Sequence, residues 1–267
     1  MRRIAWALLV ALAAVGCRGT RGVGLTDADF GMGGPSDANP FPPLDGGGAG
    51  YALSFDGMKD YATAANAGFP SAGAPQTIEM WVEYPPVPAT ADQVLFVARQ
   101  DFSNGVQLGF HGGALAVWRV YVDRVLVQAP AVPPANAWHH LAYTFDGTTH
   151  VLYVDGTAVD AQANPADERT PTSVWFGTLD GSHDLYAGLM DEVRVWTAAR
   201  TAAQVSADRL HAPPGPVPGL VAYWTFDDVG SGGRALDASG NGNTATLGDG
   251  VAGAMPSRVA SAAPVAP

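Results

Sequence analysis

The sequence predicts an all-β protein made of antiparallel strands. Between residues 138 and 159, apolar and polar side chains alternate in short runs, which is the two-residue period of a strand with one buried face. Asp146-Gly147 and Asp155-Gly156 separate these runs, and Asp-Gly pairs are typical of hairpin turns. Because strands joined by short hairpin turns pair antiparallel, this stretch predicts a β-meander. The 33 glycines and 21 prolines among 267 residues suit a fold with many turns.

Length and composition allow one β-sandwich of ordinary size with tails. Hydrophobic residues make up 47% of the chain and charged residues only 15%, so a sizeable core can form. The formal net charge is −11, whereas binding to nucleic-acid phosphates needs a basic surface. We therefore expect no nucleic-acid partner.

The N-terminal residues have the pattern of a processed export signal. Positive charge at residues 2–3 precedes the apolar run Ile4–Val15, which is too short to span a bilayer. The next residues complete the motif A-V-G-C, which resembles a bacterial lipobox ending at Cys17. We therefore expect residues 1–16 to be a lipoprotein signal peptide and Cys17 to carry the lipid that anchors the exported protein to the envelope. Arg18, in place of aspartate, favours the outer membrane; the alternative is an ordinary secretory signal with an incidental cysteine.

Residues 17–49 are predicted to be a flexible linker. They are rich in Gly, Pro and Asp, have no sustained apolar period and lack the ordered ligand spacing of an EF-hand. The folded domain is expected at residues 50–260, followed by a tail at 261–267. Because Cys17 is the only cysteine, an intramolecular disulfide is excluded.

The first half of the domain reads as a series of strands. Residues 51–61 open it and turn at Asp56-Gly57. In the strand at 77–84, Ile78, Met80, Val82 and Tyr84 share one face, whereas Glu79, Trp81 and Glu83 share the other, which we expect to face solvent. Further strands are expected at residues 93–98, 106–110 and 115–127, the last with a break near Asp123-Arg124.

The second half adds two strands, one short helix and a final strand segment. Strands are expected at 173–177 and 185–196. A helix is expected near 201–210, because Thr201 and Gln204 form a capping box. Four prolines then forbid regular structure before the strand at 219–226. Residues 219–250 either close this sandwich or are the remnant of a second copy, and the short remaining chain favours one domain.

Several short motifs occur in a recognisable order. They are F-D-G, T-I-E-x-W, W-H-H-L-A, Y-V-D-G, D-E-V-R-V-W, Y-W-x-F-D and S-G-N-G-N, spread over about residues 50–260. This order resembles the laminin-G-like domains of the concanavalin A-like lectin/glucanase fold. The resemblance implies an antiparallel jelly-roll β-sandwich that binds carbohydrate or protein at the cell envelope.

The same fold includes laminarinase-type glycosidases, so the resemblance also raises an enzymatic alternative. Those enzymes carry two glutamates flanking an aspartate on one strand, and Glu79 and Glu83 are the comparable pair, with Trp81 at the central position. Residues four apart on a strand are separated by about 13 Å, whereas a retaining pair of carboxylates lies about 5 Å apart. No H-E-x-x-H or G-x-S-x-G motif is present, although a Ser-His-Asp triad from distant residues remains open. We therefore predict a non-catalytic protein.

Calcium is the metal that the sequence favours, because Asp and Asn in loops supply the oxygen ligands it prefers. The candidate ligands are Asp56, Asp60, Asp191, Asp227, Asp237, Asn241 and Asn243. The alternative is that these residues stabilise turns without a metal.

Carbohydrate binding requires exposed aromatic side chains beside polar groups. The candidates are Trp81, Trp118, Tyr121 and Trp175, whereas Trp138, Trp196 and Trp224 lie in strands expected to supply the core. The sequence thus predicts a non-catalytic binding or adhesion module for polysaccharide or a surface protein. The alternatives are a glycan-cleaving enzyme and a purely structural surface component.

Overall fold

The computed structural model describes residues 50–65, 68–71, 73–101, 104–119, 125–163, 171–251 and 253–266. The predicted signal peptide at residues 1–16, Cys17 and the linker lie outside the described residues, as does Tyr121. No helix within the described ranges is long and apolar enough to cross a membrane.

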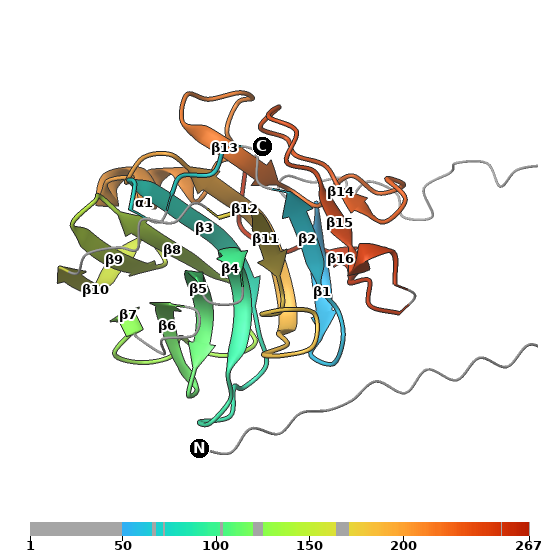
Figure 1. Ribbon diagram of the computed structural model, residues 1–267, viewed down its shortest axis with the longest axis horizontal. Coiled ribbons are helices and arrows are strands. Elements are labelled where there is room, and N and C mark those ends of the chain that lie inside the picture. Colours follow the sequence, from blue (N-terminus) through green and yellow to red (C-terminus); the bar gives the residue numbers. More distant parts are fainter. Residues whose placement is uncertain are drawn as a thin grey trace, which may run out of the picture. The chain divides into compact units, whose positions relative to one another are not determined.

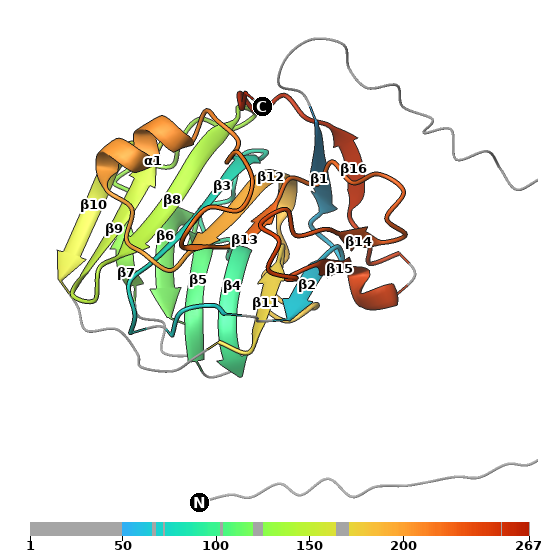
Figure 2. The same ribbon diagram turned by 90° about the horizontal axis from the view of Figure 1, so that it is seen from above.

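The described chain forms two antiparallel sheets of eight strands each (Figures 1 and 2). The order in the first, called sheet A, is β10 (Thr157–Ala163), β9 (Thr149–Val154), β8 (His139–Phe145), β3 (Gln76–Glu83), β12 (Ala187–Trp196), β1 (Tyr51–Asp56) and β16 (Ser257–Ala260), and β13 (Leu220–Trp224) also pairs with β12. The order in sheet B is β14 (Arg234–Ala235), β15 (Ala245–Leu247), β2 (Ala62–Ala65), β11 (Ser173–Phe176), β4 (Gln93–Asp101), β5 (Asn104–His111), β6 (Ala114–Arg119) and β7 (Val125–Gln128).

The main core lies between the two sheets. Ile78, Met80 and Val82 of β3 are buried there, as the alternation predicts. Sheet B contributes side chains such as Leu108 and Phe176. The predicted antiparallel jelly-roll sandwich is therefore confirmed.

The predicted meander is strands β8, β9 and β10, which pair in sequence order. At its second turn Asp155 and Gly156 both have positive φ, 50° and 81°, as tight hairpins with this sequence require. The Asp155 carboxylate accepts a hydrogen bond from the backbone N–H of His140 at 2.9 Å, which fixes the turn against β8.

Strand β12 contains a bulge that changes which residues face outward. Its register with β3 shifts between Asp191 and Arg194, and Glu192 has a left-handed φ of 54°. Met190 lies in the core before the bulge and Val193 after it, so the two-residue alternation changes phase. As a consequence Glu192 and Arg194 meet outside the main core, at 2.5 Å.

Helix α1 (Ala202–Asp208) lies against the β8–β9–β10 part of sheet A, as Figure 2 shows. Val205 packs on Ala142 and Tyr153, which lie on the outer face of this sheet. The predicted capping box of Thr201 and Gln204 is present. The helix therefore covers one outer face of the sandwich.

Residues 219–250 contribute strands to both sheets. Strand β13 pairs with β12 in sheet A, whereas β15 joins β14 to β2 in sheet B. Trp224 is fully buried and packs edge-on against Phe176 of the opposite sheet at 4.9 Å between ring centroids. Since its strands complete both layers, this segment closes the sandwich and does not begin a second copy.

Candidate functional site

The two outer faces of the sandwich differ. On sheet A, α1 and the C-terminal residues cover the strands, with Ala263 and Val265 packed on Trp81. On sheet B, the cross-strand register places one row of residues across six strands: Thr63, Trp175, Val97, Gln107, Trp118 and Val125. This row mixes aromatic, apolar and polar residues: Thr63, Trp175 and Val125 are partly exposed, whereas Val97 and Gln107 are buried. Trp175 is the centre of the candidate site.

A stack of three planar groups stands on this face. The Trp175 ring lies 5.6 Å from the Tyr61 ring at an interplanar angle of 28°. The guanidinium carbon of Arg99 lies 4.7 Å from the centre of the Trp175 ring. Tyr61 precedes β2 and Arg99 is on β4, and these strands flank β11, so the two groups hold the indole from its two sides. Trp175 and Tyr61 are partly exposed, whereas Arg99 is buried. We call these residues the aromatic stack.

The loop of residues 177–184 lies beside the aromatic stack and is held by its own hydrogen bonds. The Thr178 hydroxyl donates to the His183 carbonyl at 2.8 Å and accepts from the Gly181 N–H at 3.0 Å. Gly181 lies next to both rings, since a Cβ there would be 3.6 Å from Trp175 and from Tyr61. Leu179 packs on the outer-face cluster that includes Val97. The loop is thus a preformed wall of the site.

Carboxylates gather at this wall, which we call the acidic rim: Asp92, Asp180 and Asp184. Burial alone would raise the pKa of Asp180, but hydrogen bonds from His183 and Ser182 hold it below its ordinary value. Burial raises the pKa of Asp184, and the nearby negative charge of Asp92 raises it further. Burial lowers the pKa of Arg99, and Asp180 opposes that change.

Asp180, Ser182 and His183 lie together, but they do not form a catalytic triad. The serine hydroxyl lies 3.1 Å from Nδ1 of His183, and both carboxylate oxygens of Asp180 lie within 3.0 Å of the same nitrogen. A triad needs the serine on one ring nitrogen and the aspartate on the other. This arrangement instead orients the exposed imidazole, whose side chain is 70% accessible.

The four aromatic candidates have different positions. Trp175 is at the centre of the candidate face, and Trp118 pairs with Gln107 in the same row. Tyr121 lies outside the described residues. The expectation that Trp81 is exposed is wrong: it is 3% accessible, and its indole N–H donates to the Arg209 carbonyl at 2.9 Å.

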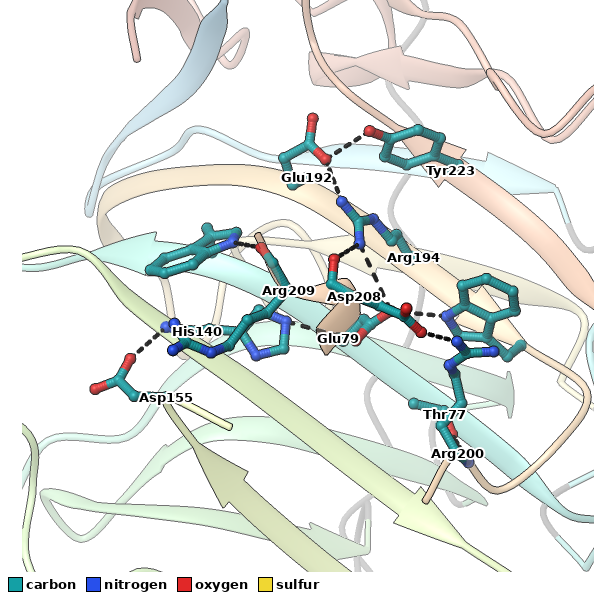
Figure 3. A network of polar contacts seen from close by, with 12 residues as sticks. Thr77, Glu79, His140, Asp155, Glu192, Arg194, Arg200, Asp208, Arg209 and Tyr223 are labelled. Atoms are coloured by element: carbon teal, nitrogen blue, oxygen red, sulfur yellow. Dashed lines mark hydrogen bonds and ion pairs between the residues drawn. The ribbon is translucent and has the colours of Figure 1, made fainter. Parts of the chain in front are cut away.

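The expectation that Glu79 faces solvent at a strand edge is also wrong. Strand β3 lies in the interior of sheet A, between β8 and β12, and Glu79 is completely buried beneath the α1 region. Its carboxylate accepts a hydrogen bond from the indole N–H of Trp196 at 2.8 Å and lies 3.5 Å from Nε2 of His140 (Figure 3). Burial would raise the pKa of Glu79, but His140 and Arg194 hold it below the ordinary value.

Arg194 links this carboxylate to the surrounding elements. Its guanidinium lies 4.0 Å from Glu79, donates to Glu192 at 2.5 Å and donates to the Asp208 carbonyl at the end of α1 at 2.9 Å. Tyr223 of β13 donates its hydroxyl to the same Glu192 carboxylate, as Figure 3 shows. The motif residues of T-I-E-x-W and D-E-V-R-V-W therefore fasten α1 and β13 to sheet A, and their buried carboxylates cannot reach a polysaccharide.

The side chains of the calcium candidates form hydrogen bonds that stabilise turns and hold strands together. Asp56 accepts from the N–H groups of Met58, Lys59 and Asp60. The other contacts of this kind are Asp60 with the Asp56 N–H, Asp191 with Ser261, Asp227 with the Tyr51 N–H, Asp237 with the N–H groups of Tyr223, Ser239 and Asn243, Asn241 with the Leu220 carbonyl, and Asn243 with the Val221 carbonyl. Within the described ranges, no three His, Cys, Asp or Glu residues are grouped to hold a metal ion. All seven candidates thus have a role in turns and strands, which is the alternative that the sequence left open, and calcium binding by them stays a prediction to be tested.

Comparison with known families identifies the fold. The family described as the concanavalin A-like lectin/glucanases superfamily, a Laminin G type, matches residues 56–206. The chain belongs to this superfamily. The matched residues include the aromatic stack, the acidic rim, and Glu79 with its partners His140, Arg194 and Trp196. Among curated proteins, no match is found.

Two solved structures are similar to this chain at low sequence identity. A protein provisionally described as carbohydrate-binding, from Bacteroides ovatus ATCC 8483, has a TM-score of 0.63 and 20% identity, and the alignment covers 81% of this chain and 61% of that one. This chain thus spans about three fifths of that protein. Domain 4 of an extracellular arabinanase from Geobacillus stearothermophilus, solved with arabinotriose, has a TM-score of 0.48 and 20% identity over 61% of this chain and 81% of that domain.

Sequence reasoning did not single out Tyr61, Arg99 or the acidic rim. Tyr61 lies at the end of the opening segment of residues 51–61, and Arg99 lies one residue beyond the strand expected at 93–98. The sequence did not show which strands lie beside that strand. The missing information was the order β2–β11–β4, which brings three distant segments side by side. Alternation gives the face of a strand, but it does not give its partners.

Proposed function

We propose that the protein is a non-catalytic carbohydrate-binding module whose ligand lies across the outer face of sheet B, centred on Trp175. The observation that carries this proposal is the aromatic stack of Tyr61, Trp175 and Arg99 in register with polar residues. A sugar ring has apolar C–H faces and a rim of hydroxyl groups, so it is recognised by aromatic carbon beside hydrogen-bonding groups. Thr63 and Thr246 are such groups in the same row, the first partly exposed and the second exposed, whereas Gln107 is buried.

The length of the row favours a chain of sugars over a monosaccharide. Trp175 and Trp118 are three strands apart in register, which corresponds to roughly 14 Å at the usual strand spacing. A second aromatic residue at this register position favours a ligand of several successive sugar rings along the row. Membership in a superfamily of lectins and glucanases supports carbohydrate as the ligand class. Binding without cleavage fits the burial of Glu79 and the unsuitable geometry of Asp180, Ser182 and His183.

The cellular setting follows from the N-terminal sequence. A lipid on Cys17 and a linker at residues 17–49 would tether the domain to the bacterial envelope, from which it would hold polysaccharide close to the cell. This part of the proposal depends on sequence motifs alone. Radiolabelled palmitate incorporation tests it: label is expected in the full chain and is expected to be absent after Cys17→Ser, and label in the serine variant would overturn it.

The binding proposal is tested with Trp175→Ala and the matched control Trp138→Ala, which removes a half-buried indole near Trp81 on the other sheet. Affinity electrophoresis is run in gels containing neutral polysaccharides and in gels containing anionic ones, with unfolding curves for each variant. Truncation of a central aromatic contact typically costs about 2 kcal/mol or more of binding energy, about thirtyfold in Kd. We expect Trp175→Ala to lose retardation and Trp138→Ala to keep it. Equal retardation of the two folded variants, or no retardation of the native protein, would overturn the proposal.

A further inference from the structure

The charge around the aromatic stack bears on which polysaccharides the face can accept. The three carboxylates of the acidic rim belong to two segments that meet at one end of sheet B. Asp92 immediately precedes β4 and accepts a hydrogen bond from the Gly112 N–H, whereas the Asp184 carbonyl accepts from the Val94 N–H at 2.8 Å. Asp180 lies on the same loop as Asp184, beside Arg99. Hydrogen bonds thus fix the carboxylate of Asp92 and the backbone at Asp184, and the N–H groups of Ser182 and His183 fix the carboxylate of Asp180.

The rim is only partly neutralised by the cation next to it. Arg99 is 4% accessible, and its guanidinium interacts with the Trp175 ring and with the negative charge of Asp180. A ligand carboxylate or sulfate therefore cannot reach it in the way that an exposed arginine is reached. The Asp92 side chain is 44% accessible, and Asp249 adds a further negative charge on the Tyr61 side of the stack. His111 and His183 face Asp92 and Asp180, and the exposed Arg234 lies in the row of Trp175 but three strands away from it, at the opposite edge from the acidic rim. The described residues on the acidic-rim side of the stack thus present carboxylates to an incoming ligand.

We infer that this face selects neutral polysaccharides and rejects polyanionic ones, such as polymers of uronic acids or sulfated sugars. The inference rests on the proposed function, because it assigns a substrate class to the same site. The aromatic stack contacts the C–H faces of any sugar, so it does not discriminate charge. The acidic rim discriminates by repulsion, since specificity arises as readily from contacts that penalise the wrong ligand as from contacts that favour the right one.

The oriented imidazole of His183 contributes to recognition of a neutral ligand. Asp180 holds its Nδ1, so Nε2 is left toward solvent beside the stack. A ring nitrogen in this position can exchange a hydrogen bond with a sugar hydroxyl. Hydroxyl groups are the polar groups that neutral polysaccharides offer, so the aromatic stack, the acidic rim and His183 point to the same ligand class.

The test uses pairs of polymers that share a backbone and differ in charge. Suitable pairs are hydroxyethylcellulose with carboxymethylcellulose, dextran with dextran sulfate, and highly methyl-esterified pectin with polygalacturonate. Affinity electrophoresis at low ionic strength measures the Kd of the native protein for each. We expect at least one neutral polymer to bind in a Trp175-dependent manner, and its anionic partner to bind at least about tenfold more weakly. Added salt should narrow this ratio, because it screens the repulsion.

Variants separate the rim from the net charge of the whole chain. Asp92→Asn with Asp184→Asn removes two rim charges, and asparagine tolerates the left-handed φ of 53° at position 184. The matched control, Glu83→Gln with Asp146→Asn, removes two charges from sheet A. We expect the first pair to reduce the neutral-to-anionic ratio severalfold and the control pair to leave it nearly unchanged. Equal changes in the two, or anionic binding as tight as neutral binding through Trp175, would overturn the inference while leaving the proposed function standing. No Trp175-dependent binding to any polymer would overturn both.

Discussion

Replacing Glu79 by glutamine tests whether the buried polar network beneath α1 stabilises the folded protein. The carboxylate is fully buried and faces His140, Arg194 and Trp196. Glutamine keeps the volume and an oxygen acceptor for the Trp196 N–H, but it leaves the charge of Arg194 with one partner fewer. Removing one member of a buried ion pair commonly costs about 3–5 kcal/mol, and the retained hydrogen bond places this variant near the lower limit, at about 3 kcal/mol.

Urea unfolding followed by tryptophan fluorescence measures this loss as a lower midpoint with an unchanged slope. For a domain of this size, about 3 kcal/mol corresponds to a fall in Tm of roughly 6–12 °C. The control is Glu83→Gln, which makes the same change four residues away at the partly exposed end of β3 and should alter stability by less than about 0.5 kcal/mol. Equal stability of the two variants, or a Glu79→Gln protein within 1 kcal/mol of the native one, would refute the reasoning.

The same pair of proteins has an expected pH signature. The pKa of Glu79 is lower in the folded protein than its ordinary value of 4.5, so the unfolded chain binds more protons as pH falls through this range. The stability that this carboxylate contributes is therefore complete above about pH 4.5 and is lost as pH falls through the folded-state pKa. The difference in unfolding free energy between the native protein and Glu79→Gln should be constant near neutral pH and shrink in acid. A difference that grows in acid would contradict this sign.

Three further predictions concern the buried Asp191, the N-terminal cap of α1 and the calcium candidates. Burial raises the pKa of Asp191 well above its ordinary value, so this group contributes stability at acid pH that is lost as pH rises. The Asp191→Asn variant should therefore have a Tm a few degrees above that of the native protein at pH 8, with a smaller difference at pH 4. A lower Tm of the variant at pH 8 would count against this prediction. Thr201→Ala removes the capping box of α1 and should cost about 1 kcal/mol in urea unfolding, whereas Thr148→Ala, in a hairpin turn, serves as the comparison. Millimolar calcium should shift the Tm of the full chain by less than about 1 °C relative to EDTA, because the candidate ligands are already used by turns; a reversible rise of several degrees would show a calcium site that this account lacks.

The strands were predictable because their alternation is strong, and the resemblance carried by the family motifs implied a two-layer sandwich. Ile78, Met80 and Val82 lie in the core as their spacing indicates. The role of Glu79 was not predictable in the same way, since a polar residue on the alternate face ordinarily meets solvent. Its burial depends on α1, a segment more than a hundred residues later in the chain. One local signal was available: in L-M-D-E-V-R-V-W, Met190 and Val193 cannot share a face of a regular strand, which indicates the bulge at Glu192.

The candidate site was predictable only in part. Trp175 was identified as an aromatic at strand spacing, but Trp81 has the same sequence character and is buried. The two residues differ in what packs on them: the C-terminal residues Ala263 and Val265 cover Trp81, whereas Trp175 remains partly exposed. Only the tertiary packing determines this difference. The acidic rim depends on the residues before β4 and the loop of residues 177–184 meeting at one end of sheet B, which no local pattern encodes.

The most direct test of the central claim is to map a bound neutral oligosaccharide by two-dimensional NMR of the ¹⁵N-labelled protein. The oligosaccharide is prepared from whichever neutral polymer retards the native protein. The account predicts amide shifts concentrated in β2, β11, β4 and residues 177–184, together with the Trp175 indole N–H. Shifts concentrated on the α1-covered face around Trp81 and His140, or shifts that persist unchanged in Trp175→Ala, would contradict it.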